Sequence, residues 1–437
     1  MNTPRLKILI VGASGFIGHH LSHHLSEHDH EVIALGRSRN KMQNLAPFCR
    51  LRSVDPVSIS TKAWGEYLQD VDAVVNCIGA FRNVPNASLL DVHEKLPERL
   101  VEACARSGCV RRFVQVSALG AAVDAPTPFL ATKGVGDAAI AAKAKDLSWP
   151  HWTVVRASVV VGEGGGSTRL FTALASQPWE LKLPDRMGRI QPIHIDDLSG
   201  LIAAALLRPE TEGQILTAAG PDRLSMSAYY KHLRDWAGIG SGIKISVPMV
   251  AMRLGAWLGQ FVPGSLLTPD ALLMLATAEA ADPAKTQALT GYTVRPLDRA
   301  LWDKPLGAGG RLRVRLEMPM VALRWALALM WLATAFISLG VYPRADSFAL
   351  LARTPLPEAT HLAALVGASL LDGVFGVLLL LGIWLRGVLA LQIATMVVFS
   401  AIIAMYLPEQ FAHPFGPVLK NLPLIFATAV LWVWEDT

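Results

Sequence analysis

Short apolar runs alternate with longer, mixed stretches over the first 160 residues of the chain. Five runs have the length of strands, and they lie at residues 7–11, 31–35, 72–77, 112–116 and 152–156. The stretches between them, among them 96–106 and 134–143, suit helices. Buried strands that alternate with helices are typical of a parallel sheet covered on both faces. The first part of the chain is therefore predicted to be an α/β domain.

The last 120 residues have a different pattern, with long apolar stretches and few polar interruptions. Residues 362–385 contain a single charged residue, Asp372, and residues 387–407 contain none. Each stretch exceeds the ~20 residues that a helix needs to cross ~30 Å of hydrocarbon. Two shorter apolar stretches lie at 325–341 and 418–434. We predict that this part is an all-α domain of four transmembrane helices.

Charge divides the chain at the same place. The 437 residues include 40 Lys+Arg and 35 Asp+Glu, giving a net charge of +5, but only 11 of these charged residues lie in 319–437. We predict a first domain at 1–306, a glycine-containing linker at 307–317 and a membrane domain at 318–437. Because no basic tail or Lys/Arg-rich helix is present, nucleic acid is not an expected partner.

The predicted topology places the first domain in the cytoplasm. The residues before the first strand lack the long apolar run of a signal peptide, and the four cysteines form no CxxC pair. Arg386, in the tight turn between the second and third spans, favours the same side. We expect a multi-pass protein of the cell inner membrane, with membrane lipid as a partner.

A glycine motif connects the first strand to the next helix. Residues 12–18 are Gly-Ala-Ser-Gly-Phe-Ile-Gly. Glycine in this turn lets the backbone approach a diphosphate, and the helix N-terminus offers it free N–H groups and a partial positive charge. The motif predicts a dinucleotide site in a Rossmann-type domain. Its expected contributors are Gly12, Ser14, Gly15, Phe16, Ile17 and Gly18.

The end of the second strand indicates which dinucleotide is bound. A carboxylate at this point usually holds the ribose 2′-hydroxyl of NAD. Here the sequence is Gly36-Arg37-Ser38, and the planar guanidinium of Arg37 can pair with a 2′-phosphate. We predict NADP(H) as the cofactor in preference to NAD(H), with a solvated loop arginine as the alternative for Arg37.

These motifs, in this order, resemble the short-chain dehydrogenase/reductase superfamily. Further similarity lies in Asp55 after the third strand, Asn-Cys-Ile-Gly at 76–79 and Val-Ser-Ala-Leu-Gly at 116–120. The resemblance implies that Asp55 lies near the adenine. It also implies that Ile78 and Gly79 line the cofactor channel.

Later segments resemble the extended and atypical branches of that superfamily. They are Thr-Val-Val-Arg at 153–156, Gly-Glu-Gly-Gly at 162–165 and Gln-Pro-Ile-His-Ile-Asp-Asp at 191–197. The pattern is most similar to the group that includes the nucleotide-binding accessory subunit of respiratory complex I. The resemblance covers about residues 5–300.

The catalytic pattern of the superfamily is incomplete in this chain. The family uses Ser, Tyr and Lys, with Tyr and Lys spaced as Tyr-x-x-x-Lys, and the phenol transfers the proton. Ser117 and Lys133 match the Ser and the Lys, but Phe129 stands at the Tyr position. Phenylalanine has no proton to transfer. Ser117 and Lys133 either keep a catalytic role with another acid or serve only cofactor binding and packing.

The membrane part resembles the DoxX-like family over about residues 318–434. The similarity is most visible at 371–376 (Leu-Asp-Gly-Val-Phe-Gly) and at 413–423. Members of that family are linked to quinone-associated redox complexes, so the resemblance implies a redox setting. An ionisable side chain such as Asp372 is costly inside a span. Asp372 could have a function, by carrying a proton or contacting a quinone head group. Alternatively, it forms an ion pair with Arg324 or a hydrogen bond between helices.

Two other features have structural explanations. Six of the twelve histidines lie between His19 and His30, and we interpret them as a solvated helix face, assigning no metal site. His194, Asp196 and Asp197 are interpreted as structural or as supporting the residues that contact the substrate, and not as a metal site. The apolar stretches at 249–261 and 266–276 suit either a lid over an apolar substrate or helices on a membrane surface.

Two functions remain compatible with the sequence. The first is a membrane-anchored, NADP(H)-binding oxidoreductase that acts on a lipophilic carbonyl or a quinone. The second is a catalytically silent NADP(H)-binding subunit that assembles or senses a membrane redox complex. Phe129 favours the second function.

Overall fold

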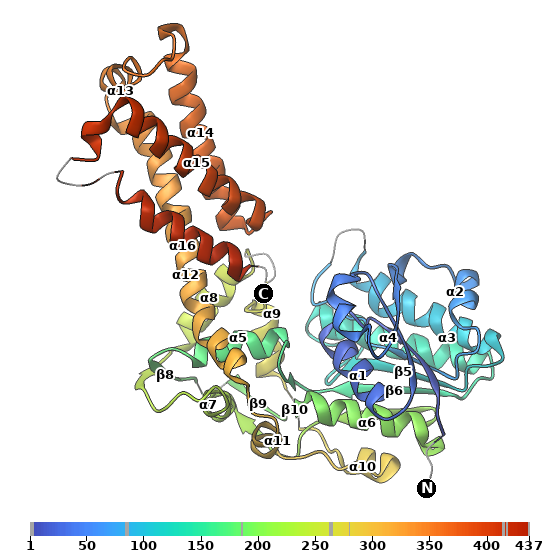
Figure 1. Ribbon diagram of the computed structural model, residues 1–437. Helices are drawn as coiled ribbons and strands as arrows, with labels where there is room; N and C mark the ends of the chain where they lie inside the picture. The colour runs from blue at the N-terminus through green and yellow to red at the C-terminus, as the bar shows by residue number, and fades with distance from the viewer. Residues whose placement is uncertain are drawn as a thin grey trace. The chain divides into compact units, whose positions relative to one another are not determined.

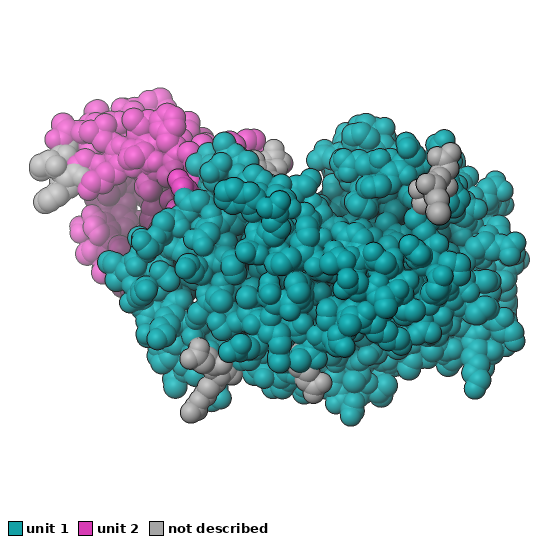
Figure 2. Space-filling view, turned by 90° about the horizontal axis from the view of Figure 1, so that it is seen from below, with its two compact units in different colours: residues 1–260, 265–314 teal, residues 261–264, 315–437 magenta. Residues whose placement is uncertain are grey.

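The computed structural model describes residues 4–83, 87–184, 187–261, 265–278, 280–412, 416 and 418–435. Part of the 413–423 motif thus lies outside the described residues. The chain forms two compact units (Figure 2). One comprises Met1–Gln260 with Ser265–Val314, and the other comprises Phe261–Gly264 with Arg315–Thr437.

A seven-stranded sheet forms the centre of the first unit (Figure 1). Its strand order is β11-β6-β5-β4-β1-β2-β3, and every neighbouring pair is parallel. The order reverses between β1 and β4, which creates the crevice where doubly wound sheets bind ligands. The strands are β1 (Lys7–Val11), β2 (Glu31–Gly36), β3 (Arg50–Ser53), β4 (Ala73–Asn76), β5 (Arg112–Ala118), β6 (Trp152–Ala157) and β11 (Gln214–Ala218).

Helices cover both faces of this sheet because its strands are apolar on both sides. Ile8 and Ile10 of β1 belong to one core with α1 (Phe16–Glu27) and α6 (Ile195–Leu207). Leu9 and Val11 belong to the opposite core. That core also contains side chains of α2 (Thr61–Tyr67), α3 (Leu96–Ser107) and α4 (Pro128–Asp146). The predicted Rossmann-type α/β fold is confirmed.

Smaller elements extend the first unit beyond the carboxyl ends of the strands. Three two-stranded sheets pair β7 (Val160–Val161) with β10 (Ile193–His194), β9 (Arg189–Ile190) with β12 (Leu224–Ser225), and β8 (Trp179–Lys182) with β13 (Ile243–Ser246). The helices are α5 (Gly166–Ala175), α7 (Met226–Trp236), α8 (Met249–Gly259), α9 (Pro269–Ala276), α10 (Ala284–Thr290) and α11 (Leu297–Asp303). A separate core, which includes Met226, Tyr229 and Leu301, joins most of these elements, whereas Leu289 of α10 packs against the core of the large sheet.

The second unit is helical. Its elements are α12 (Ala308–Phe336), which begins within the first unit, followed by α13 (Arg344–Leu351), α14 (His361–Leu381), α15 (Leu385–Tyr406) and α16 (Asn421–Trp434). Three helical segments are long and apolar enough to cross a membrane: Ala308–Val341, Glu358–Leu381 and Leu385–Tyr406. A helical domain with membrane spans is thus confirmed.

Two sequence predictions differ from the structure of this region. The fourth predicted span, 418–434, is a helix of only 14 residues, since α16 begins after Lys420. At 1.5 Å per residue its length is about 21 Å, which is short of the hydrocarbon thickness. The segment predicted as a linker at 307–317 is helical from Ala308 onward. The helix accommodates Gly309 and Gly310 because the arginines and leucines that follow them are strong helix formers.

Candidate functional site

The glycine loop after β1 is held tightly against β2. Gly12 has a φ of +94°, a backbone conformation that residues other than glycine rarely adopt. The Gly12 N–H donates to the Leu35 carbonyl at 2.8 Å, and the Gly15 N–H donates to the Gly12 carbonyl at 2.9 Å. A Cβ on Gly18 would lie only 2.4 Å from the Gly12 carbonyl oxygen. The glycines thus let α1 pack directly on the loop.

The N-terminus of α1 is open for an anion. Gly15 caps the helix without a side-chain hydrogen bond, and the first turn contains no acidic residue. The first N–H groups of a helix have no partner within it, so those at Phe16 and Ile17 are available to a ligand. Together with the helix dipole, they have the chemistry that a phosphate site at this loop would need.

A pocket at this loop gathers most of the predicted cofactor residues. Seven predicted residues line it: Gly12, Ser14, Gly15, Arg37, Asp55, Ile78 and Gly79. Phe16, Ile17, Gly18, Ser117 and Lys133 lie outside its lining. Val57, Ala80 and Val92 also line the pocket and were not predicted, because they are apolar residues in irregular or helical segments with no motif around them.

The end of the pocket where the adenosine is expected is formed by the ends of β2 and β3. Gly36 is required there, since a Cβ on it would lie 2.8 Å from the Ser14 hydroxyl oxygen. Arg37 is exposed, and its guanidinium pairs with no carboxylate among the residues described. Asp55 accepts a hydrogen bond from the Val57 N–H at 3.2 Å, which fixes the turn after β3.

Phe129 does not face open space at the family's tyrosine position. Its ring stacks on Phe81 with centroids 4.4 Å apart and an interplanar angle of 20°. The edge of His93 packs against it at 5.6 Å. At the position where the superfamily has its proton-transferring tyrosine, this chain therefore has a phenylalanine packed in an aromatic cluster. Phe129 has no exchangeable proton.

His93, which was not predicted, supports this cluster. Its Nε2 accepts from the Ala80 N–H at 3.1 Å, so the ring proton lies on Nδ1 and donates to the Thr132 hydroxyl oxygen at 2.8 Å. Thr132 in turn donates to the Pro128 carbonyl at 2.8 Å. Burial, with the nearby charge of Lys133, lowers the pKa of His93 to about 3. A neutral imidazole with both ring nitrogens hydrogen-bonded does not act as an acid at neutral pH, so His93 has a structural role.

Lys133 is buried at the carboxyl ends of two central strands. Its Nζ donates to the carbonyls of Val116 at 3.1 Å and Ile78 at 3.3 Å. Burial lowers its pKa to about 8, although the carboxylate of Asp137 opposes the shift. Asp137 is itself held by the Nε of Arg156 at 2.8 Å.

Ser117 lies on the strand next to Lys133. Its hydroxyl oxygen is buried and has no hydrogen-bond partner among the residues described. The structure thus places Ser117 near the end of β5, next to Val116, whose carbonyl accepts from Lys133 of α4, and neither Ser117 nor Lys133 lines the pocket at the glycine loop.

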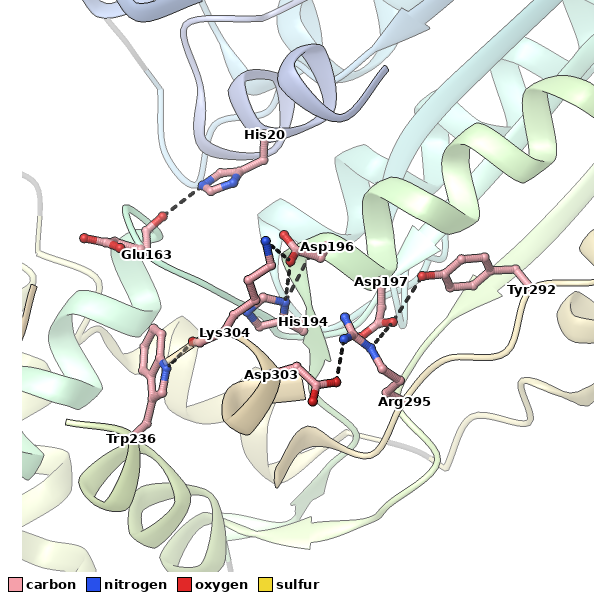
Figure 3. A network of polar contacts seen from close by, with 10 residues as sticks. All are labelled: His20, Glu163, His194, Asp196, Asp197, Trp236, Tyr292, Arg295, Asp303 and Lys304. Atoms are coloured by element: carbon pink, nitrogen blue, oxygen red, sulfur yellow. Dashed lines mark hydrogen bonds and ion pairs between the residues drawn. The ribbon is translucent and has the colours of Figure 1, made fainter. Parts of the chain in front are cut away.

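A polar network holds the substrate-side segment against the nucleotide-binding helix (Figure 3). His20 Nε2 lies 3.0 Å from the Glu163 carbonyl. His194 caps α6 by accepting from the Asp196 N–H at 3.2 Å. The fully buried Asp197 accepts from Tyr292 at 3.1 Å and pairs with Arg295 at 3.0 Å. These contacts agree with a structural role for His194 and the two aspartates.

No group of three or more His, Cys, Asp or Glu side chains is arranged to hold a metal ion in the part of the chain that the structure describes.

Family models match both parts of the chain. Residues 12–175 match an NAD(P)H-binding family, and residues 328–429 match the DoxX-like family. The chain therefore combines an NAD(P)-binding region with a C-terminal DoxX-like region.

Curated relatives extend the similarity of the first part. The mitochondrial NADH dehydrogenase [ubiquinone] 1 alpha subcomplex subunit 9 of Dictyostelium discoideum is 25% identical over 253 residues, covering 56% of this chain and 68% of that protein. Its Arabidopsis thaliana counterpart is 24% identical over 237 residues, covering 52% of this chain and 58% of that protein. The first domain is thus similar to a complex I subunit over roughly half of this chain.

Solved structures share the fold of the first part. The UDP-glucuronic acid 4-epimerase of Bacillus cereus, in complex with UDP-glucuronic acid and NAD, has a TM-score of 0.51 at 20% identity and covers 68% of this chain and 97% of its own. The dTDP-glucose 4,6-dehydratase of Bacillus anthracis, in complex with NAD, has a TM-score of 0.52 at 14% identity, covering 68% of this chain and 94% of its own.

Proposed function

We propose that the protein is a membrane-anchored NADP(H)-binding subunit that does not carry out the carbonyl chemistry of short-chain reductases. The glycine loop and the open N-terminus of α1 would hold the diphosphate. Asp55 would contact the adenosine, and Ile78 and Gly79 would line the path to the nicotinamide. When bound, the nicotinamide supplies hydride chemistry.

The preference for the phosphorylated cofactor rests on the end of β2. Arg37 is exposed and unpaired among the described residues, and Gly36 and Ser38 flank it where NAD-binding domains carry a carboxylate. A guanidinium in this place attracts a 2′-phosphate and gains nothing from a 2′-hydroxyl. We therefore propose NADP(H).

The stacking of Phe129 on Phe81 is the observation that carries the silent-subunit proposal. Loss of a positioned general acid costs about 10²–10⁴ in rate, and the neighbouring groups do not replace it. Thr132 already donates to a carbonyl, His93 is neutral with both ring nitrogens bonded, and the Lys133 ammonium donates to two carbonyls.

The test is NADPH oxidation by the full-length protein in lipid nanodiscs, with panels of carbonyl compounds and quinones as acceptors. The proposal expects bound nucleotide that stays unoxidised with every acceptor. Phe129→Tyr restores the missing phenol and is the variant in which carbonyl reduction could emerge. Turnover by the native protein that is abolished in Lys133→Met would contradict the proposal.

A second function, reduction of a lipophilic quinone, is favoured by the surface of α8. Val250, Leu254 and Trp257 are 75%, 55% and 52% exposed and lie on one face of this helix. Such a face suits contact with lipid, through which an apolar acceptor would arrive. Hydride transfer to a quinone requires one further proton, which water can supply, so Phe129 does not exclude this reaction.

The proposed setting is a redox assembly of the cell inner membrane with the first domain in the cytoplasm. The similarity to a complex I subunit and the DoxX-like domain support such an assembly. Arg386, in the first turn of α15 next to the α14–α15 connection, supports the orientation.

A further inference from the structure

Helix α8 of the first unit has an apolar side that is exposed. Val250, Leu254, Trp257 and Leu258 are each more than half exposed. At about 100° of rotation per residue, these four side chains lie within an arc of about 100° on one side of the helix. A surface helix of a globular protein normally has polar side chains on its exposed side. We refer to these four residues as the outer face of α8.

The opposite side of α8 packs against the first unit itself. Met249 and Met252 contact the core that the smaller elements share. A Cβ on Gly259 would lie 2.2 Å from the Leu267 carbonyl oxygen, and a Cβ on Gly255 would lie 3.6 Å from the Leu267 Cδ2 atom. The chain after α8 therefore passes directly against this side of the helix. Because α8 is packed as a fixed part of the unit, the structure favours a membrane-surface helix over a lid for this stretch.

The strand before α8 continues the exposed apolar surface along the chain. All four residues of β13 are exposed, and Ile243 and Ile245 lie on the same face because side chains alternate along a strand. In the register of the two-stranded sheet, Ile243 is opposite Trp179 and Ile245 is opposite Leu181. Single exposed apolar residues are common on protein surfaces, whereas apolar faces on two successive elements indicate an interaction site.

The charged residues of this segment favour an anionic partner. Residues 241–260 contain two basic side chains, Lys244 and Arg253, and no Asp or Glu. Both basic residues are exposed. At the same rotation per residue, Arg253 lies about 40° beyond Trp257, at the edge of the outer face. An arginine at such an edge can lay its aliphatic stem along apolar surface while its guanidinium reaches the phosphates of lipid head groups.

A bilayer is the partner that the chain itself keeps close to this surface. Helix α12 begins within the first unit at Ala308 and continues as the candidate span Ala308–Val341. A surface that is tethered to its partner binds it at a high effective concentration, so even a small apolar face can stay in contact. A separate protein would not have this advantage.

We propose that α8 is a second, peripheral membrane anchor, which lies along the bilayer surface with its outer face among the acyl chains and Arg253 at anionic phospholipid head groups. Helices of this kind bury their apolar side about 5–10 Å into the boundary between head groups and acyl chains. The inference rests on the anchoring of the chain in lipid and uses the same α8 face as the second proposed function. It depends neither on that reaction nor on nucleotide binding.

The test is photo-cross-linking from lipid to the full-length protein, held as one copy per nanodisc without nucleotide. The probe is a phosphatidylcholine with a diazirine in its acyl chain, in a host lipid of either phosphatidylcholine or phosphatidylglycerol. Cross-linked residues are mapped by mass spectrometry, with α14 and α15 as the positive reference and α2 as the background. The expected result is cross-linking on the outer face of α8, about fivefold stronger in phosphatidylglycerol, the effect of one cation near an anionic surface.

Leu254→Glu and a matched control, Phe48→Glu, test whether the outer face makes the contact. The two side chains are 55% and 54% exposed, so neither change should lower the Tm appreciably. Leu254→Glu should reduce the cross-linking of α8 about tenfold, because a buried leucine is replaced by a charge. Phe48→Glu should leave it unchanged. Val250→Glu changes the same face and replaces Leu254→Glu if that variant proves unstable.

Three results would overturn the proposal. The first is cross-linking of native α8 at the background level, which is expected if α8 is a lid or if another protein covers its outer face. The second is an unchanged yield on α8 in a stable variant of the outer face. The third is an equal yield in the two host lipids, which would remove the assignment of anionic head groups. Arg253→Gln should by itself reduce the preference for phosphatidylglycerol, and an undiminished preference would show that Arg253 does not contact the head groups.

Discussion

The two units differ in how their buried carboxylates are paired. In the first unit, Asp197 is fully buried yet paired with Arg295 and Tyr292, and the buried Asp137 is paired with Arg156. In the second unit, Asp372 Oδ1 and both amide atoms of Gln392 are buried without a hydrogen-bond partner among the described residues. The contrast indicates that paired carboxylates help to hold the first unit together, whereas the buried carboxylate of the second unit has unused hydrogen-bonding capacity.

The largest effect that would sharpen this contrast comes from Asp197→Ala. Removing the carboxylate leaves Arg295 and Tyr292 without their shared partner and should lower the free energy of unfolding by about 3 kcal/mol. Chemical unfolding of the full chain in detergent measures the change. Arg299→Ala removes an exposed ion pair with Asp303 and, as the control, should cost under about 0.5 kcal/mol. Equal effects of the two variants would refute the structural role of the network.

Arg37→Ala addresses nucleotide choice in the first unit. Loss of a charge-assisted contact with a 2′-phosphate is worth about 1.5–3 kcal/mol, so the affinity for NADPH should fall about 10- to 100-fold while that for NADH stays unchanged. Isothermal titration of both nucleotides gives the ratio, and Arg39→Ala is the neighbouring control. If the ratio of the two dissociation constants does not move, Arg37 does not select the cofactor.

Gln392→Leu should change the free energy of unfolding in the opposite direction from Asp197→Ala. Replacing an unpaired buried amide by an apolar group of similar size should raise the free energy of unfolding by about 1 kcal/mol. Differential scanning fluorimetry in the same detergent, with Ser369→Ala as reference, measures this. A clearly lower free energy of unfolding in Gln392→Leu would contradict this difference between the two units.

The smallest effect concerns pH. Lys133, with a pKa lowered by burial to about 8, is positively charged below that pH and becomes neutral above it. The charged form attracts an anionic nucleotide, so NADPH affinity should fall by about two- to threefold between pH 7 and 9, as for a screened interaction of about 0.5 kcal/mol. Lys133→Met should lack this change. If the NADPH affinity of the native protein has the same pH dependence as that of Lys133→Met, the charge of Lys133 does not contribute to nucleotide binding.

The sequence was most informative where local chemistry determines structure. The apolar runs predicted five sheet strands to within two residues at either end, and the glycine motif predicted the loop and the open helix end, because these features depend on residues close in the chain. The network of Asp197, Tyr292 and Arg295 was beyond its reach, since the partners are about 95 residues apart. His93 carries no motif, so its contact with Phe129 required the tertiary structure.

The membrane part shows the complementary limit. Apolar length predicted the two central spans well, but it predicted a fourth span where the helix has only 14 residues. Charge alone suggested an Asp372–Arg324 pair, although helix packing places the guanidinium near Gly382. Hydropathy reports which residues avoid water, while the pairing of polar groups depends on how the helices pack.

The central claim is that a phosphorylated pyridine nucleotide binds over the amino end of α1 in a protein anchored in lipid. Isothermal titration of NADPH into the full-length protein in nanodiscs, beside Gly12→Ala, tests it most directly. The account predicts saturable one-to-one binding by the native protein. The variant should bind about 5- to 30-fold more weakly, because its added Cβ is strained at a φ of +94° by about 1–2 kcal/mol. Absence of detectable binding of either NADPH or NADH to the folded native protein would contradict it.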